Sequence, residues 1–83
     1  MIPERAKETI DLYVEHGCEP GSFIYAVLTN NLIGAIGRAD EHNLANIRSI
    51  CQYVYNDITS ECWGSEEKVK AWMEKRRIIK EKP

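Results

Sequence analysis

The stretch Ser22–Ile36, SFIYAVLTNNLIGAI, decides the fold prediction because it holds the longest apolar run of the 83-residue chain. Its first residue is a favourable helix N-cap. Apolar side chains recur at helical spacing, at Val27, Leu28, Leu32 and Ala35, although the first half also has the composition of a strand. Since apolar side chains wrap most of the circumference, we predict a helix that is buried within one subunit or at a subunit interface.

Asn30 and Asn31 interrupt this apolar segment. Asparagine side chains compete with the backbone for hydrogen bonds, so they are unexpected inside a buried helix. Their presence predicts either hydrogen bonds between subunits or the lining of a polar pocket.

Three more helices are expected, over about Pro3–His16, over Asp40–Asn56 and from Ser65 onwards. Proline suits a first helical turn, aspartate and serine are favourable N-caps, and Gly17 is a C-terminal stop. Within the third helix a 3-4 spacing indicates a narrow seam against another helix, formed by Leu44, Ile47, Cys51, Val54 and Ile58. Cys51 is therefore expected to be a small buried hydrophobe.

In the last helix, Glu66 and Lys70 form an i, i+4 pair in the favourable orientation, and residues 75–83 are expected to fray. The chain is thus predicted to be all-α. We expect a compact bundle of three to four short helices that forms a single domain over residues 1–83. Because so small a domain buries a modest share of its surface, we expect it to assemble as a homo-oligomer.

Composition narrows the class of protein. The chain is 43% hydrophobic and 29% charged, which excludes a disordered tail, and no apolar run approaches the roughly 18 residues of a membrane span. The first residues lack the apolar region of a signal peptide. Three widely spaced cysteines, without a C-x-x-C pair, indicate a reducing compartment and no disulfide framework.

Charge is placed unevenly along the chain. Residues 1–67 carry a net charge of −7, whereas residues 68–83 carry +5. An acidic body with a basic end suggests head-to-tail contact between copies or recognition of an anion near that end. The simpler interpretation is that these cations complement the negative end of a helix dipole.

No catalytic or metal-binding motif is present. The sequence contains no G-x-x-x-x-G-K-[ST], G-x-S-x-G or H-E-x-x-H pattern. His16 lies two residues from Cys18, but no third group is evident that would orient them as base and nucleophile. The potential metal ligands do not have zinc-ligand spacing; they are His16, Cys18, His42 and Cys62. We therefore expect a protein that is not an enzyme and needs no metal or cofactor.

Two aromatic residues and one helix start could bind a ligand or only support the fold. Tyr25 follows a helix start and Trp63 lies in a loop, so each either faces outward or packs in the core. The helix start at Ser65, with Lys68 one turn in, exposes N–H groups that can bind a phosphate. However, Glu66 and its neighbour repel an anion there, which favours an ordinary capped helix start.

Taken together, segments between about residues 10 and 72 resemble a family of very small proteins of tailed bacteriophages. The segments are Tyr13-Val14, Pro20–Phe23, Ala26–Leu32, Arg38–Asp40, Asn43-Leu44, Tyr53–Asn56, Trp63–Glu66 and Lys68. The chain has Asn31 where an aspartate is expected, and Cys18-Glu19 where an apolar residue and a proline are expected.

Such proteins are similar to the anti-CBASS nucleotide sponges, which form compact oligomers and sequester cyclic oligonucleotide signals. The resemblance implies a phage anti-defence protein of the host cytoplasm that binds cyclic oligonucleotides without cleaving them and binds copies of itself. It implies no membrane and no DNA or RNA duplex as a partner. Two alternatives are an inhibitor that binds a host defence protein through its acidic surface and an accessory phage protein without a ligand.

If the chain is such a sponge, its own residues supply the candidate contacts. Tyr13 and Tyr25 are candidates to stack on bases. Lys68 and the Ser65 helix start would bind phosphate. Thr29 and Asn30 would read base edges.

Overall fold

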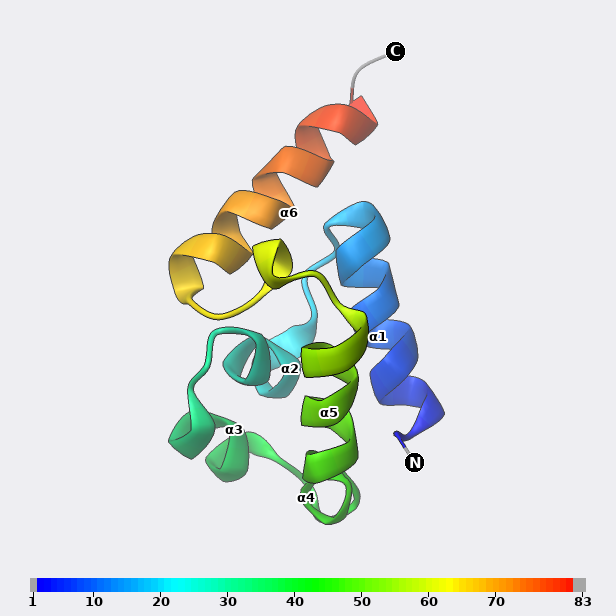
Figure 1. Ribbon diagram of the computed structural model, residues 1–83, viewed down its shortest axis with the longest axis vertical. Coiled ribbons are helices and arrows are strands. Elements are labelled where there is room, and N and C mark those ends of the chain that lie inside the picture. Colours follow the sequence, from blue (N-terminus) through cyan, green and yellow to red (C-terminus); the bar gives the residue numbers. More distant parts are fainter. Residues whose placement is uncertain (1, 82–83) are drawn as a thin grey trace.

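The computed structural model describes the backbone of residues 2–81 and the side chains of residues 2–77, and this part of the chain is all-α, as predicted (Figure 1). The elements follow in the order α1 Glu4–His16, α2 Gly21–Leu28, α3 Leu32–Arg38, α4 Glu41–Ala45, α5 Ile47–Asp57, η1 Ser60–Cys62 and α6 Glu66–Glu81. The predicted number of three to four helices is too low, because two of the expected helices are each divided.

The first division falls at Thr29–Asn31, where one helix over residues 22–36 was expected. The Thr29 hydroxyl donates to the Tyr25 carbonyl at 2.8 Å and so closes the end of α2. Asn30 adopts the left-handed conformation, with φ of 63°. Asn31 then caps α3, because its side-chain oxygen accepts the Gly34 N–H at 2.9 Å. The two asparagines therefore end one helix and start another.

The second division falls at Asn46, inside the helix expected over residues 40–56. Asp40 caps α4 as predicted, accepting the Asn43 N–H at 2.7 Å. The Asn46 amide donates to the His42 carbonyl at 2.8 Å and thereby caps the end of α4. A new helical register starts at Ile47, so the predicted seam is partly wrong. Ile50, Val54 and Ile58 are buried, whereas Leu44 and Cys51 are exposed.

The core lies between α1, α2, α5 and the first half of α6. Its buried side chains are Ala6, Ile10, Tyr13, Phe23, Ile24, Ala26, Leu28, Ala35, Ile50, Val54, Ile58, Cys62, Val69 and Trp72. The Trp72 indole donates to the Val14 carbonyl at 3.1 Å and ties α6 to α1.

The predicted helix ends at Gly17 and Ser65 are confirmed. Gly17 has φ of 70° and passes so close to α6 that an added Cβ would lie 2.9 Å from the Met73 carbonyl oxygen. The Ser65 hydroxyl accepts the Lys68 N–H at 3.1 Å at the start of α6. The predicted cap at Ser22 is wrong, because Pro20 is the N-cap of α2 and Ser22 is the second residue of that helix.

Helix α6 extends away from the rest of the molecule (Figure 1). The whole molecule measures 42 × 23 × 21 Å along its principal axes. It is helical to Glu81. The fraying expected over residues 75–83 stays a prediction, and its last two residues lie outside the described part. Among the described residues, none of the helices is long and apolar enough to cross a membrane.

Candidate functional site

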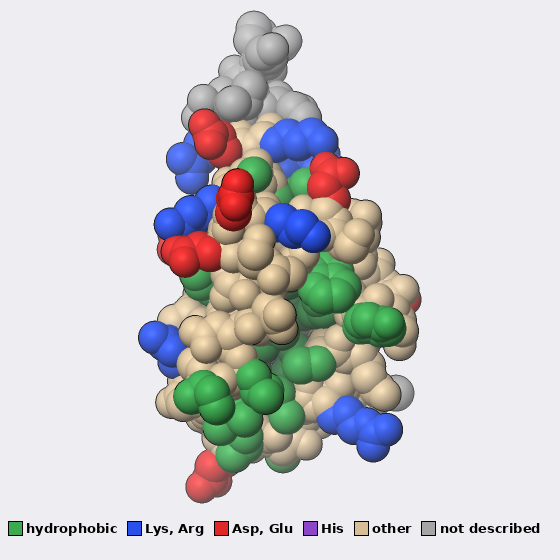
Figure 2. Space-filling view, turned by 60° about the vertical axis from the view of Figure 1, so that its left-hand side comes forward, with side chains coloured by type: hydrophobic (Ala, Val, Ile, Leu, Met, Phe, Trp, Pro, Cys, Tyr) green, Lys and Arg blue, Asp and Glu red, His purple; other side chains and the backbone are tan. Residues whose placement is uncertain are grey.

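A groove of about 380 Å³ lies between α5, the end of α2 and the loop before α6. We call it the aromatic groove; it is lined by Val27, Asn30, Arg48, Cys51, Gln52, Val54, Tyr55 and Trp63. In Figure 2 hydrophobic side chains gather on the lower part of the face shown, whereas charged side chains gather around α6 above. A groove of this size lies within the range typical of small-molecule sites.

Two aromatic rings form one wall of the groove. The Tyr55 side chain is 74% exposed, and its ring centroid lies 6.0 Å from that of Trp63 at an interplanar angle of 56°. The Trp63 indole is held in place because it donates to the Ile58 carbonyl at 3.0 Å. The Gly64 N–H donates to the Leu28 carbonyl at 2.7 Å, which fastens this loop to the end of α2.

Three polar side chains share the groove with these rings. Arg48 and Gln52 come from α5, and Asn30 comes from the turn after α2. Arg48 makes no ion pair with any described residue. The groove therefore combines flat rings, a guanidinium and two amides, a set of groups that can stack on a base, bind an anion and read a base edge.

Sequence reasoning found Asn30 and suspected Trp63, but it missed Tyr55, Arg48 and Gln52. A signal for the missed residues exists, because positions 48, 52 and 55 have the i, i+4, i+7 spacing of one helix face. The sequence could not indicate that this face of α5 contacts Trp63.

The expectation that Tyr13 stacks on a ligand is wrong. Its side chain is 0% exposed, and its hydroxyl donates to the Cys62 carbonyl at 2.7 Å in the core. Burial raises the pKa of this phenol. Tyr13 is thus a packing residue, because η1 and α6 close over the face of α1 on which it lies.

Three other predicted residues, Tyr25, Ser65 and Lys68, lie around the start of α6 and outside the groove. Burial and the neighbouring Glu66 carboxylate raise the pKa of Tyr25. Lys70 pairs with Glu66 at 2.9 Å, as predicted, and that pair together with the Tyr25 hydroxyl lowers the pKa of Glu66.

The groups at this helix start are already occupied within the chain. The Lys68 ammonium donates to the Ser60 carbonyl at 3.3 Å, and the Ser65 hydroxyl caps α6. The Thr29 hydroxyl is likewise used, because it donates to carbonyls of α2. With Glu66 beside it, this region is less suited to a phosphate than the groove is.

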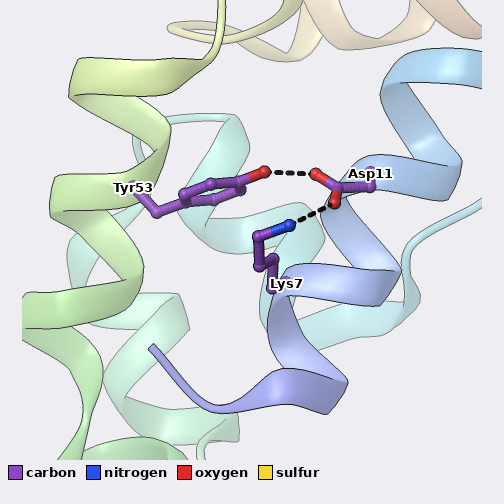
Figure 3. A network of polar contacts seen from close by, with 3 residues as sticks. All are labelled: Lys7, Asp11 and Tyr53. Atoms are coloured by element: carbon purple, nitrogen blue, oxygen red, sulfur yellow. Dashed lines mark hydrogen bonds and ion pairs between the residues drawn. The ribbon is translucent and has the colours of Figure 1, made fainter. Parts of the chain in front are cut away.

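A separate polar cluster joins α1 to α5 (Figure 3). Asp11 accepts a hydrogen bond from the Tyr53 hydroxyl and pairs with Lys7 at 3.0 Å. The Lys7 ammonium also lies 5.5 Å from the centre of the Tyr53 ring. The three side chains are hydrogen-bonded or ion-paired with one another, so this cluster connects α1 to α5.

Among the described residues, no group of three or more histidine, cysteine, aspartate or glutamate side chains is placed to hold a metal ion. The chain matches no protein-family model, and no curated protein or solved structure is significantly similar to it.

Proposed function

We propose that this protein is a non-catalytic anti-defence protein of the bacteriophage type, which sequesters cyclic oligonucleotides as a homo-oligomer. The observation that carries the proposal is the aromatic groove, where the rings of Tyr55 and Trp63 share about 380 Å³ with the Arg48 guanidinium and two side-chain amides. One nucleotide unit of the ligand occupies this groove, with its base against the rings.

The chemistry of the groove matches the parts of a nucleotide. Stacking of a base on an aromatic side chain contributes about 1–3 kcal/mol. The Arg48 guanidinium has the planar set of donors that suits a phosphate, and the Asn30 and Gln52 amides can both donate to and accept from a base edge.

The number of binding groups in one groove also supports a homo-oligomer. A cyclic oligonucleotide carries at least two phosphates and two bases, whereas the groove offers one guanidinium and one pair of rings. A second copy would supply the second set. Binding by several copies together raises the affinity beyond that of one groove.

Calorimetry with a panel of cyclic di- and trinucleotides tests the proposal. Arg48→Ala and Tyr55→Ala should each weaken binding about tenfold or more, since each removes one stacking or charged contact. Tyr25→Ala and Lys68→Ala, which change the start of α6, are the matched comparison and should leave affinity nearly unchanged. The reverse pattern would place the ligand at α6 and overturn the assignment of the groove.

The fate of the ligand is the second readout. After incubation and denaturation of the protein, the nucleotide should be recovered intact. A cleaved product would make the chain an enzyme. A lack of binding across the whole panel would contradict the proposal and leave the alternative, direct inhibition of a host defence protein, to be tested.

A further inference from the structure

Two side-chain carboxamides line the aromatic groove from different elements. Asn30 comes from the turn that follows α2, whereas Gln52 comes from the middle of α5, and the groove lies between these two parts of the chain. Neither carboxamide forms a hydrogen bond with another described residue. By contrast, the carboxamides of Asn31 and Asn46 cap α3 and α4. The groove therefore offers a ligand two unused carboxamides, each with a donor beside an acceptor.

The charge of the groove decides which groups contact the base. Of the described residues that line it, Arg48 is charged and none is acidic. In the proposed function this guanidinium binds a phosphate, because a phosphate that loses water without gaining a counter-charge is costly to bind. A guanidinium can also bind the O6 and N7 acceptors of guanine, but the phosphate would then have no cation in the groove. Recognition of the base therefore falls to the two carboxamides.

We infer that the base held in the aromatic groove is adenine, recognised by the Asn30 and Gln52 carboxamides on its two edges away from the ribose. The inference rests on the proposed function and names its ligand class, cyclic oligonucleotides that contain adenine. On one edge the 6-amino donor of adenine lies beside the N7 acceptor, and on the other edge the same amino group lies beside the N1 acceptor. Each edge matches one carboxamide, which is how asparagine and glutamine pair with adenine.

The other bases match this pair of carboxamides less well. Guanine presents two acceptors on its N7 edge, which suit a guanidinium, and two adjacent N–H donors on its N1 edge, which suit a carboxylate. A pyrimidine offers a donor beside an acceptor to one carboxamide only, so the second carboxamide stays unpaired. Its smaller ring also stacks over less of the Tyr55 and Trp63 rings. Adenine is thus the base that uses both carboxamides and the stacking surface together.

Calorimetry of the full chain with cyclic di-AMP, cyclic di-GMP and cyclic di-UMP tests the inference. Cyclic di-AMP should bind about tenfold or more tightly than either of the others. An analogue of cyclic di-AMP that contains 7-deazaadenine, and so lacks the N7 acceptor, should bind about tenfold more weakly than cyclic di-AMP. Equal affinities, or a preference for guanine or uracil, would overturn the adenine assignment and leave the proposed function standing. Binding of none of the three would overturn both.

Exchange of a carboxamide for a carboxylate is the sharper test. Gln52→Glu and Asn30→Asp keep the shape of the side chain but remove its N–H donors, so each should shift selectivity towards guanine. Aspartate tolerates the left-handed backbone of position 30 as asparagine does. The added negative charge also repels the phosphates of every nucleotide. The readout is therefore the ratio of the affinities for cyclic di-AMP and cyclic di-GMP, which should fall about tenfold or more.

Two further variants separate selectivity from charge. Gln52→Ala removes a carboxamide without adding a charge and should also lower the affinity ratio. Asn56→Asp is the matched control, because Asn56 is an exposed residue of α5 that does not line the groove, so the same exchange should leave the ratio unchanged. Circular dichroism verifies that every variant is folded. A ratio that stays constant in the groove variants, or that changes as much in Asn56→Asp, would overturn the inference.

Discussion

The Tyr13 hydroxyl donates to the backbone carbonyl of Cys62 across 49 positions of the chain, and both residues are 0% exposed. This bond joins α1 to η1 in the centre of the core. A buried carbonyl that loses its donor is left without water to replace it. Tyr13→Phe should therefore lower the free energy of unfolding by about 1–2 kcal/mol, measured by urea denaturation. Tyr55→Phe, at an exposed position, is the control and should change it by less than about 0.5 kcal/mol.

The Asp11 cluster should stabilise the fold in a pH-dependent way. Burial alone would raise the pKa of Asp11, but hydrogen bonds from Tyr53 and Lys7 outweigh it, so the pKa lies below the usual 3.8. A lowered pKa means that the carboxylate adds stability above pH 3.8 and loses it as the pH falls further. Because Asp11 is partly exposed, Asp11→Asn should cost about 1 kcal/mol at neutral pH.

Unfolding of wild type and Asp11→Asn at several pH values between about 2 and 7 checks this expectation. The difference between the two proteins should shrink as the pH falls below 4. A difference that stays constant over that range would show that the charge of Asp11 does not contribute to the stability that the polar cluster provides.

The backbone conformation of Asn30, in the turn between α2 and α3, should affect the stability of the fold. Asn30 has φ of 63°, a conformation that asparagine tolerates and that glycine adopts without steric cost. Asn30→Ala should lower the free energy of unfolding by about 1 kcal/mol, whereas Asn30→Gly should be close to neutral. Thermal unfolding of both variants measures this, and equal losses would contradict the backbone explanation.

The three cysteines should differ in reactivity. Cys18 and Cys51 are exposed, whereas Cys62 is buried, and burial raises the pKa of the Cys62 thiol to about 11. A thiol reagent at neutral pH should therefore modify two cysteines in the folded protein and the third only after denaturation. Mass spectrometry of digested protein identifies the sites. Rapid modification of Cys62 in the folded state would contradict the described core.

Modification of Cys51 also reports on the groove that it lines. A bulky adduct there should weaken nucleotide binding, and Cys51→Ala should make binding insensitive to the reagent while leaving affinity nearly unchanged. Modification of Cys18 is the internal comparison, because Cys18 does not line the groove.

Local chemistry made much of the fold predictable. Caps at Asp40 and Ser65 and the stop at Gly17 depend on a few neighbouring residues, so their positions could be inferred from the chain order. The division at Asn30-Asn31 had a local signal as well, since polar residues interrupted an apolar segment. We interpreted these polar residues as a pocket lining or a subunit contact. In the structure they end α2 and begin α3, where the Asn31 side chain caps the first turn.

The site depended on contacts between distant segments. Tyr13 and Tyr55 are similar residues on amphipathic helices, yet one is buried under η1 and the other is open to solvent. Trp63 reaches the α5 face because Gly64 bonds to Leu28 and the indole bonds to Ile58. Sequence alone determined the helical class and the helix ends at Gly17, Asp40 and Ser65, because capping and periodicity are local. Only the tertiary structure decided which aromatic side chains are buried and which form the groove, because burial depends on which helix packs over each face.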